Sequence, residues 1–266
     1  MSGAVVKVET LLEGHRLDTN QGSVAFCSVN LVEVEDGDGV VKRALVDTGH
    51  TGRRVPLQRA LARRGLSCAD VDVLVCTHAH WDHIENLDLF ERARIVLHRD
   101  ERRYLKRPHR NDFACPAWVD AVFDRFGSRI DEVEEGTEVL PGVKVIEAPG
   151  HSAGTIALAA RTDQGTAVLT GDSVQNSTVA IEGRNALVFW DEALAARTIA
   201  KLTSIADVIY PGHDRPFRLI KGGGVEYLRP FQLTLLNVAP GEPGLEFDDR
   251  PPFSPVVMEG IEDQHW

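Results

Sequence analysis

The stretch Thr77-His78-Ala79-His80-Trp81-Asp82-His83 places four potential metal ligands within six residues. Neutral imidazole is the commonest metal ligand in proteins, so a chance cluster of surface histidines is a weak explanation. His78 and His80 are two residues apart and therefore point to the same side of an extended segment. Asp82 and His83 are adjacent and would diverge there. One short loop could thus supply two neighbouring metal positions, two imidazoles to one and an Asp-His pair to the other.

The segments on either side of this stretch predict its place in the fold. Residues 71–76 are apolar apart from Asp72, and three of them are β-branched valines, which predicts a buried strand. The loop then lies at the carboxyl end of that strand, where open α/β sheets usually carry their chemistry. Residues 84–90 are predicted to form a short helix with Asp82 and His83 at its N-terminus, where a carboxylate interacts favourably with the helix dipole.

Composition indicates a globular chain without a membrane segment. A chain of 266 residues, 43% of them apolar, suits a single large unit, and no stretch is apolar enough to span a bilayer. The N-terminus lacks the pattern of a signal peptide, so we expect a cytoplasmic protein. The four cysteines have no C-x-x-C spacing, which favours buried thiols over disulfides or a thiolate zinc site. The net charge of −11 disfavours a polyanion as the main substrate.

The rest of the chain alternates predicted strands with a few helices. Residues 5–13 and 23–34 are predicted as antiparallel strands separated by a turn at 18–22. Helical periodicity appears at 55–65 and 191–205. Further strands are expected at 40–46, 93–98, 139–148, 155–161, 166–170 and 207–210. We expect one domain over residues 1–220, with residues 221–266 as a further strand and a surface arm of the same domain, available for a homodimer contact.

More candidate site residues stand near predicted strand ends. Three further potential ligands are His151 after a Pro-Gly turn, Asp172 after a glycine, and His213 after a second Pro-Gly turn. Asp47 also ends a strand, where it could either orient a metal-binding histidine or cap the next helix. His50 follows it closely. The loops at 104–120 and 174–190 are expected to shape a substrate pocket, with Arg184 and Trp190 as candidate substrate contacts.

The order His-x-His-x-Asp-His, His151, Asp172, His213, together with Leu45-Val46-Asp47-Thr48-Gly49, resembles the metallo-β-lactamase superfamily in its glyoxalase II and lactonase branch. The resemblance covers roughly residues 20–220. It implies an α/β fold, an αβ/βα sandwich of two mixed β-sheets flanked by helices. Residues 84–90 and 206–218 are most similar to the small single-domain members called metallo-β-lactamase domain-containing hydrolases. Those members usually have a small residue where Glu85 stands, so Glu85 is expected to add a carboxylate near the cleft.

The resemblance also implies a role for each ligand. His78, His80 and His151 look like a first metal site, and Asp82, His83 and His213 like a second, with Asp172 as the bridging carboxylate. Two divalent ions are implied, with zinc favoured and iron or manganese left open. In such centres a metal-bridging hydroxide attacks the substrate, and Asp82 would be the catalytic residue that orients it. Asp172 points away from antibiotic hydrolysis, because zinc β-lactamases proper have a cysteine there or lack this carboxylate.

Three functions follow, in order of preference. The first is hydrolysis of a small ester, lactone or thioester, with a small-molecule substrate and no membrane partner. The second is a phosphodiesterase or ribonuclease acting on RNA, which the arginines between Arg53 and Arg64 motivate and the acidic balance disfavours. The third is a non-hydrolytic metal-binding or di-iron redox protein. Its relatives need a flavin-binding partner domain, and ferric iron would colour the protein.

Overall fold

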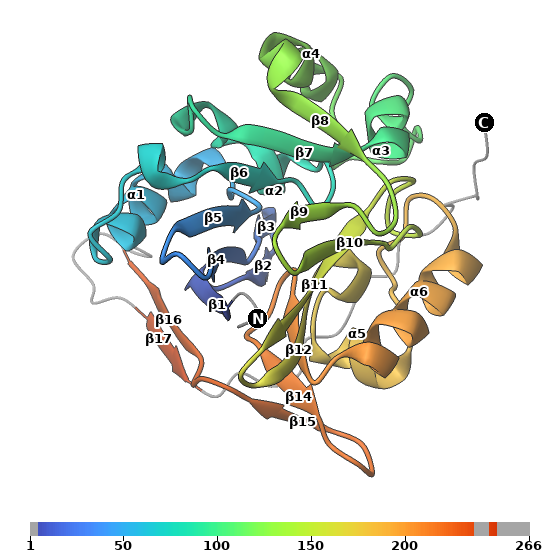
Figure 1. The fold of residues 1–266 in the computed structure, drawn as a ribbon. Coiled ribbons are helices and arrows are strands. Elements are labelled where there is room, and N and C mark those ends of the chain that lie inside the picture. The colour runs from blue at the N-terminus through green and yellow to red at the C-terminus, as the bar shows by residue number, and fades with distance from the viewer. Residues whose placement is uncertain (1–4, 237–244, 249–266) are drawn as a thin grey trace.

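Two mixed β-sheets pack face to face in the computed structural model, which describes residues 5–236 and 245–248 (Figure 1). The six-stranded sheet has the order β1-β4-β5-β6-β7-β8, with the last four strands mutually parallel. Its strands are β1 (Val5–Leu12), β4 (Val29–Glu35), β5 (Val41–Val46), β6 (Val73–Val75), β7 (Arg94–His98) and β8 (Ile130–Val133). The expected sandwich of two mixed sheets is confirmed.

The seven-stranded sheet has the order β15-β14-β13-β12-β11-β10-β9, and only β12 and β13 run parallel. Its strands are β9 (Glu138–Leu140), β10 (Val143–Glu147), β11 (Ile156–Thr162), β12 (Gly165–Gly171), β13 (Val208–Pro211), β14 (Phe217–Leu219) and β15 (Val225–Tyr227). The single strand predicted at 139–148 is thus two strands. Gly142, at φ +77°, makes the turn between them.

Helices cover the outer faces of both sheets. In Figure 1, α1 lies on the far side of the first sheet, and α5 and α6 lie on the far side of the second. The α-helices are α1 (Arg54–Ala62), α2 (Trp81–Ile84), α3 (Arg99–Tyr104), α4 (Trp118–Phe126), α5 (Ser177–Glu182) and α6 (Glu192–Ile205). Short 3-10 turns lie at Thr51–Arg53, Cys68–Asp70, Leu87–Leu89, Gly127–Arg129 and Asp172–Val174. The helix predicted at 191–205 is confirmed, with the Asp191 carboxylate accepting from the Leu194 amide as its cap.

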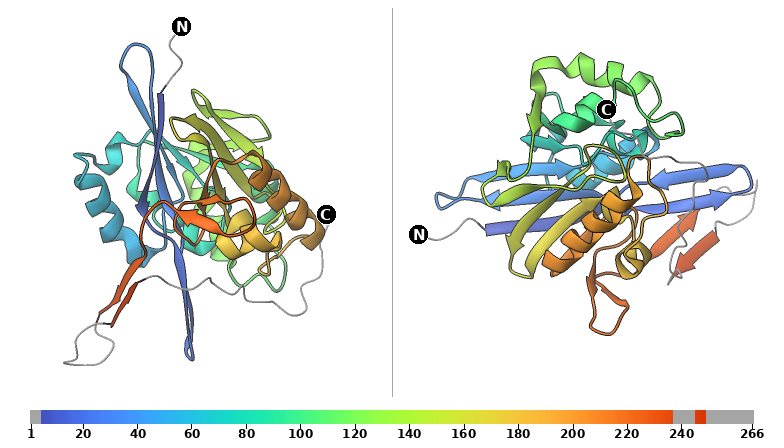
Figure 2. Two further views of the ribbon diagram at one scale, coloured as in Figure 1. Left: turned by 90° about the horizontal axis from the view of Figure 1, so that it is seen from below. Right: turned by 90° about the vertical axis from the view of Figure 1, so that its right-hand side faces the viewer.

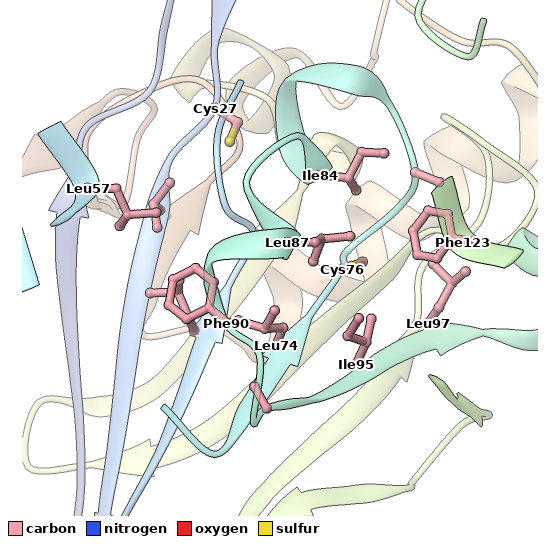
Figure 3. Packing of buried hydrophobic residues seen from close by; sticks show 14 of the residues in the cluster. Cys27, Leu57, Leu74, Cys76, Ile84, Leu87, Phe90, Ile95, Leu97 and Phe123 are labelled. Carbon is pink, nitrogen blue, oxygen red and sulfur yellow. The ribbon is translucent and has the colours of Figure 1, made fainter. Parts of the chain in front are cut away.

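The strand before the first ligand loop shows how the core is built. Along β6 the side chains alternate, so Val73 and Val75 face the second sheet while Leu74 and Cys76 face the helical layer. Figure 3 shows Leu74 and Cys76 among buried residues of neighbouring strands and helices. Because both faces are covered, the strand is apolar throughout. The predicted buried strand is confirmed, although it is shorter than residues 71–76 and covers only Val73–Val75, and it positions the loop that follows.

Two predictions of local structure near the site are wrong. Residues 5–34 form four strands rather than two, because β2 (His15–Thr19) and β3 (Gly22–Phe26) pair only with each other. The chain turns sharply between β3 and β4, where the Ser28 amide donates to the Gly212 carbonyl at 2.6 Å. The helix expected at 84–90 instead begins at Trp81 as α2 and ends after one turn. Beyond it, the buried Asn86 side chain donates to three backbone carbonyls of residues 48–50.

The chain beyond residue 220 first completes the second sheet and then leaves it. Residues 221–266 contain more than the single further strand predicted there, and the first, β15, pairs with β14 at the sheet edge. β16 (Gln232–Leu235) pairs with β17 (Leu245–Asp248), and Figure 2 shows this pair and the β2–β3 hairpin projecting from the body. Residues 237–244 and 249–266, the remainder of the predicted surface arm, lie outside the described residues, and the homodimer stays a prediction. No described helix is long and apolar enough to cross a bilayer.

Candidate metal centre

All seven predicted ligands meet at one edge of the sandwich, although five different elements bring them there. His78 and His80 follow β6, and Asp82 and His83 lie in α2. The other three follow strands of the second sheet: His151 after β10, Asp172 after β12 and His213 after β13. Every one is buried, with at most 7% of its surface exposed. Their potential ligand atoms fall into overlapping groups whose members lie within 4.8 Å of one another.

His78, His80 and His151 form the first triad. The Nδ1 of His80 lies 3.0 Å from Nε2 of His78 and 3.0 Å from Nε2 of His151. The outer nitrogens of all three rings are occupied: His78 Nδ1 contacts Thr77 Oγ1 at 3.0 Å, His80 Nε2 contacts Asp112, and His151 Nδ1 contacts the Leu187 carbonyl at 2.7 Å.

These outer contacts determine where the protons of the first triad sit. A carbonyl or carboxylate only accepts, so His151 carries its proton on Nδ1 and His80 carries one on Nε2. With both rings neutral, the inward nitrogens of His80 and His151 would present lone pairs 3.0 Å apart. Two such acceptors repel unless a proton or a metal ion lies between them. The first triad therefore fits a metal ion.

Asp82, His83 and His213 form the second triad. Oδ2 of Asp82 lies 3.5 Å from Nε2 of His83 and 3.4 Å from Nε2 of His213. The outer nitrogens are again held, His83 Nδ1 by Asp47 at 2.8 Å and His213 Nδ1 by the Phe26 carbonyl at 3.0 Å. Although both atoms are buried, Asp82 Oδ2 and His83 Nε2 have no hydrogen-bond partner. Buried polar atoms without partners are costly, so this triad also fits a cation.

Asp172 lies between the two triads. Its Oδ1 is 3.3 Å from Nε2 of His83, and its Oδ2 is 3.2 Å from Nε2 of His213 and 3.6 Å from Nε2 of His151. Oδ1 has no hydrogen-bond partner, whereas Oδ2 accepts from the Gln175 amide at 2.9 Å. A carboxylate that reaches histidines of both triads has the position expected of a bridging ligand.

Burial and charge set the pKa values of the two triads apart. In the first, burial lowers the pKa of His78 well below its usual value and that of His151 to about 4. Burial also lowers the pKa of His80, but the adjacent Asp112 carboxylate outweighs it and the net shift is upward. Two of the three imidazoles are therefore neutral at pH 7 and ready to bind a metal.

The second triad has the opposite balance. Burial opposes the charged form of His83 and His213, yet Asp82 raises the pKa of His83 and Asp172 raises that of His213. Burial alone would raise the pKa of Asp172, but His213 and His83 hold it well below its usual value. Without metal, protons on the histidines of the second triad balance the charge of the carboxylates. A metal ion that binds there would have to displace these protons. A mixed imidazole and carboxylate set of this kind suits zinc, iron or manganese.

Two buried carboxylates that the sequence analysis missed support the first triad. Glu101 in α3 accepts from the Ala79 amide at 2.9 Å and from the Gly154 amide at 2.9 Å, so it joins the loops that carry His78, His80 and His151. Asp112 accepts from Nε2 of His80 at 3.1 Å. Burial raises the pKa of Glu101. Nothing in the sequence separates Glu101 from its charged neighbours at 99–103.

Asp47 lies where a ligand-orienting residue is expected. Its Oδ2 accepts from Nδ1 of His83 and from the Thr77 hydroxyl, and its Oδ1 accepts from the Thr77 amide. It does not cap the next helical turn, a role that His50 takes by accepting from the Gly52 amide. Asp47 has φ +60°, the only positive φ found among the described non-glycine residues. Of the two roles left open for Asp47, the geometry favours orientation of His83.

Glu85, Arg184 and Trp190 do not line the cavity beside the ligands. The Glu85 carboxylate accepts from the amide and hydroxyl of Thr51, both at 2.7 Å, and lines a different hollow next to α4. Arg184 pairs with Glu192 on the surface. Trp190 is buried in the core with its ring edge-on to Tyr104. These side chains have structural partners that a linear sequence does not reveal.

A cavity of about 280 Å³ opens beside the ligands. Asp82, Asp172, His80 and His213 line it together with Gln175. Apolar side chains form much of the remaining wall, namely Ala25, Trp81, Phe113, Ala114 and Leu187. The loops at 104–120 and 174–190 contribute to the wall as expected. The β2–β3 hairpin was not expected there and contributes Arg16, Ser23 and Ala25.

A sandwich of two mixed sheets with a buried His/Asp cluster at its edge is the architecture of a metal-dependent hydrolase. The family model of the metallo-beta-lactamase superfamily matches residues 24–213, and the chain belongs to this superfamily. The chain is 32% identical to "Metallo-beta-lactamase domain-containing protein 1" of Xenopus laevis, over 83% of this chain and 85% of the relative. It is 27% identical to an N-acyl homoserine lactonase of Bacillus thuringiensis, over 58% of this chain and 60% of the relative.

Solved structures agree with the fold. A putative metallo-beta-lactamase from Thermotoga maritima aligns with 80% of this chain and 99% of its own, at a TM-score of 0.62 and 22% identity. AidC, a dizinc quorum-quenching lactonase, aligns with 78% of this chain and 80% of its own, at a TM-score of 0.59 and 16% identity.

Proposed function

We propose that the chain is a dinuclear metal-dependent hydrolase of small esters, lactones or thioesters, with zinc as its metal. The observation that carries this proposal is the pair of triads joined by Asp172 beside a small and largely apolar cavity. The first triad would hold one cation and the second triad the other. The similarity to an N-acyl homoserine lactonase supports a lactone or related ester as substrate.

Two bound divalent ions would polarise the substrate carbonyl and lower the pKa of water towards about 7. The residues of the chain supply the rest. Asp82 would hold the second ion through Oδ2, and its carboxylate also lies on the cavity wall, so its other oxygen can orient the attacking water and accept its proton. The oxygen of water then bonds to the acyl carbon, the bond to the leaving oxygen or sulfur breaks, and Asp82 returns the proton to the leaving group.

The cavity wall favours a small acyl substrate. Its volume of about 280 Å³ is near the lower end for small-molecule pockets. Trp81, Phe113 and Leu187 offer apolar surface on which a hydrocarbon part of the substrate can pack and exclude water. Gln175 holds Asp172 in place through its amide.

The arginines at 53–64 do not strengthen the RNA alternative. The Arg53 guanidinium is turned inward and donates to the backbone carbonyls of Cys27 and Glu13. Arg54 pairs with Asp88, and Arg64 pairs with Glu9. With three of its five arginines engaged in this way, and only Arg59 and Arg63 left exposed, this face is a weak binding surface for a polyanion. The acyl substrate class therefore remains the proposal.

Hydrolysis of a small substrate panel tests this function. Zinc-loaded protein is mixed with an N-acyl homoserine lactone, a simple thioester and a phosphodiester, before and after chelation. We expect turnover of the lactone or thioester, loss of turnover after chelation, and recovery with zinc. Asp82→Asn should abolish turnover, whereas Asp88→Asn, which alters a surface ion pair one turn further along the chain, should not. Turnover of the phosphodiester alone, or of nothing, would contradict the proposal.

A further inference from the structure

Asp112 connects a predicted metal ligand to the wall of the cavity. Its side chain is fully buried, and its two carboxylate oxygens have separate tasks. Oδ2 accepts from Nε2 of His80 at 3.1 Å and from the Tyr104 hydroxyl at 2.7 Å. Oδ1 accepts from the amides of Ala114 and Cys115, each at 3.0 Å. One carboxylate therefore holds both a histidine of the first triad and the turn that follows Asp112.

That turn forms part of the substrate cavity. Phe113 and Ala114 line the cavity, and the Ala114 carbonyl accepts from the amide of Trp81 at 3.0 Å. Phe113 is 61% exposed, and its ring is edge-on to that of Phe189 with the ring centroids 5.5 Å apart, so packing alone fixes it weakly. Besides these contacts, the two hydrogen bonds to Asp112 Oδ1 hold residues 112–115, and His80 and Tyr104 place that carboxylate.

We propose that Asp112 is a positioning residue that couples metal binding in the first triad to the shape of the cavity wall at residues 109–115. A cation on Nδ1 of His80 fixes the ring and strengthens the Nε2–H donor towards Asp112. The fixed carboxylate in turn holds the amides of Ala114 and Cys115. By linkage, a ligand that packs against Phe113 and Ala114 would bind more tightly when the first triad holds a metal, and the metal would be held more tightly by the same factor. The inference rests on the proposed metal centre but does not depend on hydrolysis.

Glu101 provides the matched contrast. It is equally buried and also supports the first triad, through the amides of Ala79 and Gly154 and the Ser152 hydroxyl at 2.6 Å. None of its hydrogen bonds reaches residues 109–115. Glu101→Gln should therefore weaken metal binding and leave the coupling to the wall intact.

Asp112→Asn separates the two tasks. An amide group has one oxygen and one NH2, whereas the groups on both sides of the Asp112 carboxylate are donors. His80 Nε2–H and the Tyr104 hydroxyl donate to Oδ2, and the Ala114 and Cys115 amides donate to Oδ1. If the asparagine oxygen faces Ala114 and Cys115, the turn survives but the NH2 opposes the His80 donor. The asparagine oxygen can accept from His80 or from the amides of Ala114 and Cys115, but not from both. The link between the metal and the cavity wall is therefore broken without a change in side-chain volume.

Hydrogen exchange of the peptide covering residues 109–115 measures the coupling directly, with Zn²⁺ as the probe and no substrate present. In the wild type, saturating Zn²⁺ should slow exchange of the Ala114 and Cys115 amides by about 5- to 150-fold, the usual range of coupling between two sites. In Asp112→Asn this slowing should vanish, and Zn²⁺ affinity should fall about 10- to 100-fold, as for other residues that orient metal ligands. Glu101→Gln should need more Zn²⁺ but regain the full slowing at saturation.

Each result has a distinct meaning. Zn²⁺ binding to the wild type with unchanged exchange at 109–115 would overturn the coupling and leave the metal centre standing. If Zn²⁺ slows exchange at residues 109–115 in Asp112→Asn as much as in the wild type, the role of Asp112 in the coupling would likewise be overturned. Absence of Zn²⁺ binding to the wild type would overturn both the metal centre and the coupling. Loss of turnover with normal binding and a normal exchange response would count against the proposed hydrolysis alone.

Discussion

The two triads use similar residues but differ in charge and in access to the cavity. The first triad consists of imidazoles alone, and only His80 of its three residues lines the cavity. The second contains a carboxylate, and both Asp82 and His213 line the cavity. The first triad is thus enclosed and mostly neutral, as expected of a site that mainly binds a metal ion. The second triad presents its charged groups to the cavity.

The supports behind the triads differ in the same way. Behind the first lie buried carboxylates from a single stretch of chain, Glu101 and Asp112, which follow β7. Behind the second lie Asp47 at the end of β5 and the Phe26 carbonyl at the end of β3. Asp172 is the residue that makes the two halves one centre, because its carboxylate oxygens face histidines of both. The difference shows that each half can be perturbed separately, while Asp172 cannot be changed without affecting both.

The largest effect is therefore expected for Asp172→Ala. Removal of the carboxylate takes the shared acceptor from His83, His213 and His151, so the second ion should be lost and hydrolysis should be abolished. Metal content and turnover on the same preparation give the measurement. Asp207→Ala is the control, because Asp207 is an exposed carboxylate just before β13 that accepts from the Thr166 amide far from the ligands. A variant that keeps both ions and full turnover would show that Asp172 does not bridge.

Two glycines allow each half to be disturbed by a single methyl group. A Cβ on Gly154 would lie 2.0 Å from the backbone nitrogen of Glu101, so the loop after His151 would have to move. A Cβ on Gly212 would lie 2.2 Å from Oδ1 of Asp172, so the bridging carboxylate and the loop of His213 would have to move. In a two-step metal titration, Gly154→Ala should weaken the first-triad step and Gly212→Ala the second-triad step. If both variants weakened the same step, the division into two halves would be incorrect.

A smaller effect is expected for Asp47→Asn. Asparagine tolerates the left-handed backbone at φ +60°, so the fold should persist. The side chain loses the carboxylate oxygen that accepts from His83 Nδ1, and metal affinity in the second triad should fall about 10- to 100-fold. The metal titration gives the measurement. Asp36→Asn, in the distant turn between β4 and β5, should leave both affinities unchanged. Equal losses in both triads would mean that Asp47 acts mainly through Thr77, which contacts His78.

The ligands were predictable from the sequence because each stands at a strand end within a short local motif. His151 and His213 follow Pro-Gly turns, and the loop 77–83 follows an apolar run, so the pattern of the chain puts each of them at a strand end. The resemblance to the metallo-β-lactamase superfamily then implies that they share one site. Glu101 and Asp112 were not predictable in the same way. Their roles depend on hydrogen bonds to residues 22 and 32 positions away in sequence, which no local pattern encodes.

The β2–β3 hairpin was missed for a related reason. Residues 15–26 have weak alternation and turn-like composition, so they were assigned partly to a connection. In the fold, β3 leads to Ser28, whose amide donates to the Gly212 carbonyl of the second sheet's loop. Gly14 leaves space for this contact, since a Cβ on Gly14 would lie 2.5 Å from the Gly212 carbonyl oxygen. The predicted second strand therefore breaks where the two sheets meet, and the hairpin projects over the cavity.

The most direct test of the central claim is the zinc content of the wild-type chain, measured by elemental analysis after equilibration with buffered zinc. The account predicts two zinc ions per chain, one for each triad. A plateau at one ion, or at none, would contradict a dinuclear centre built on Asp172.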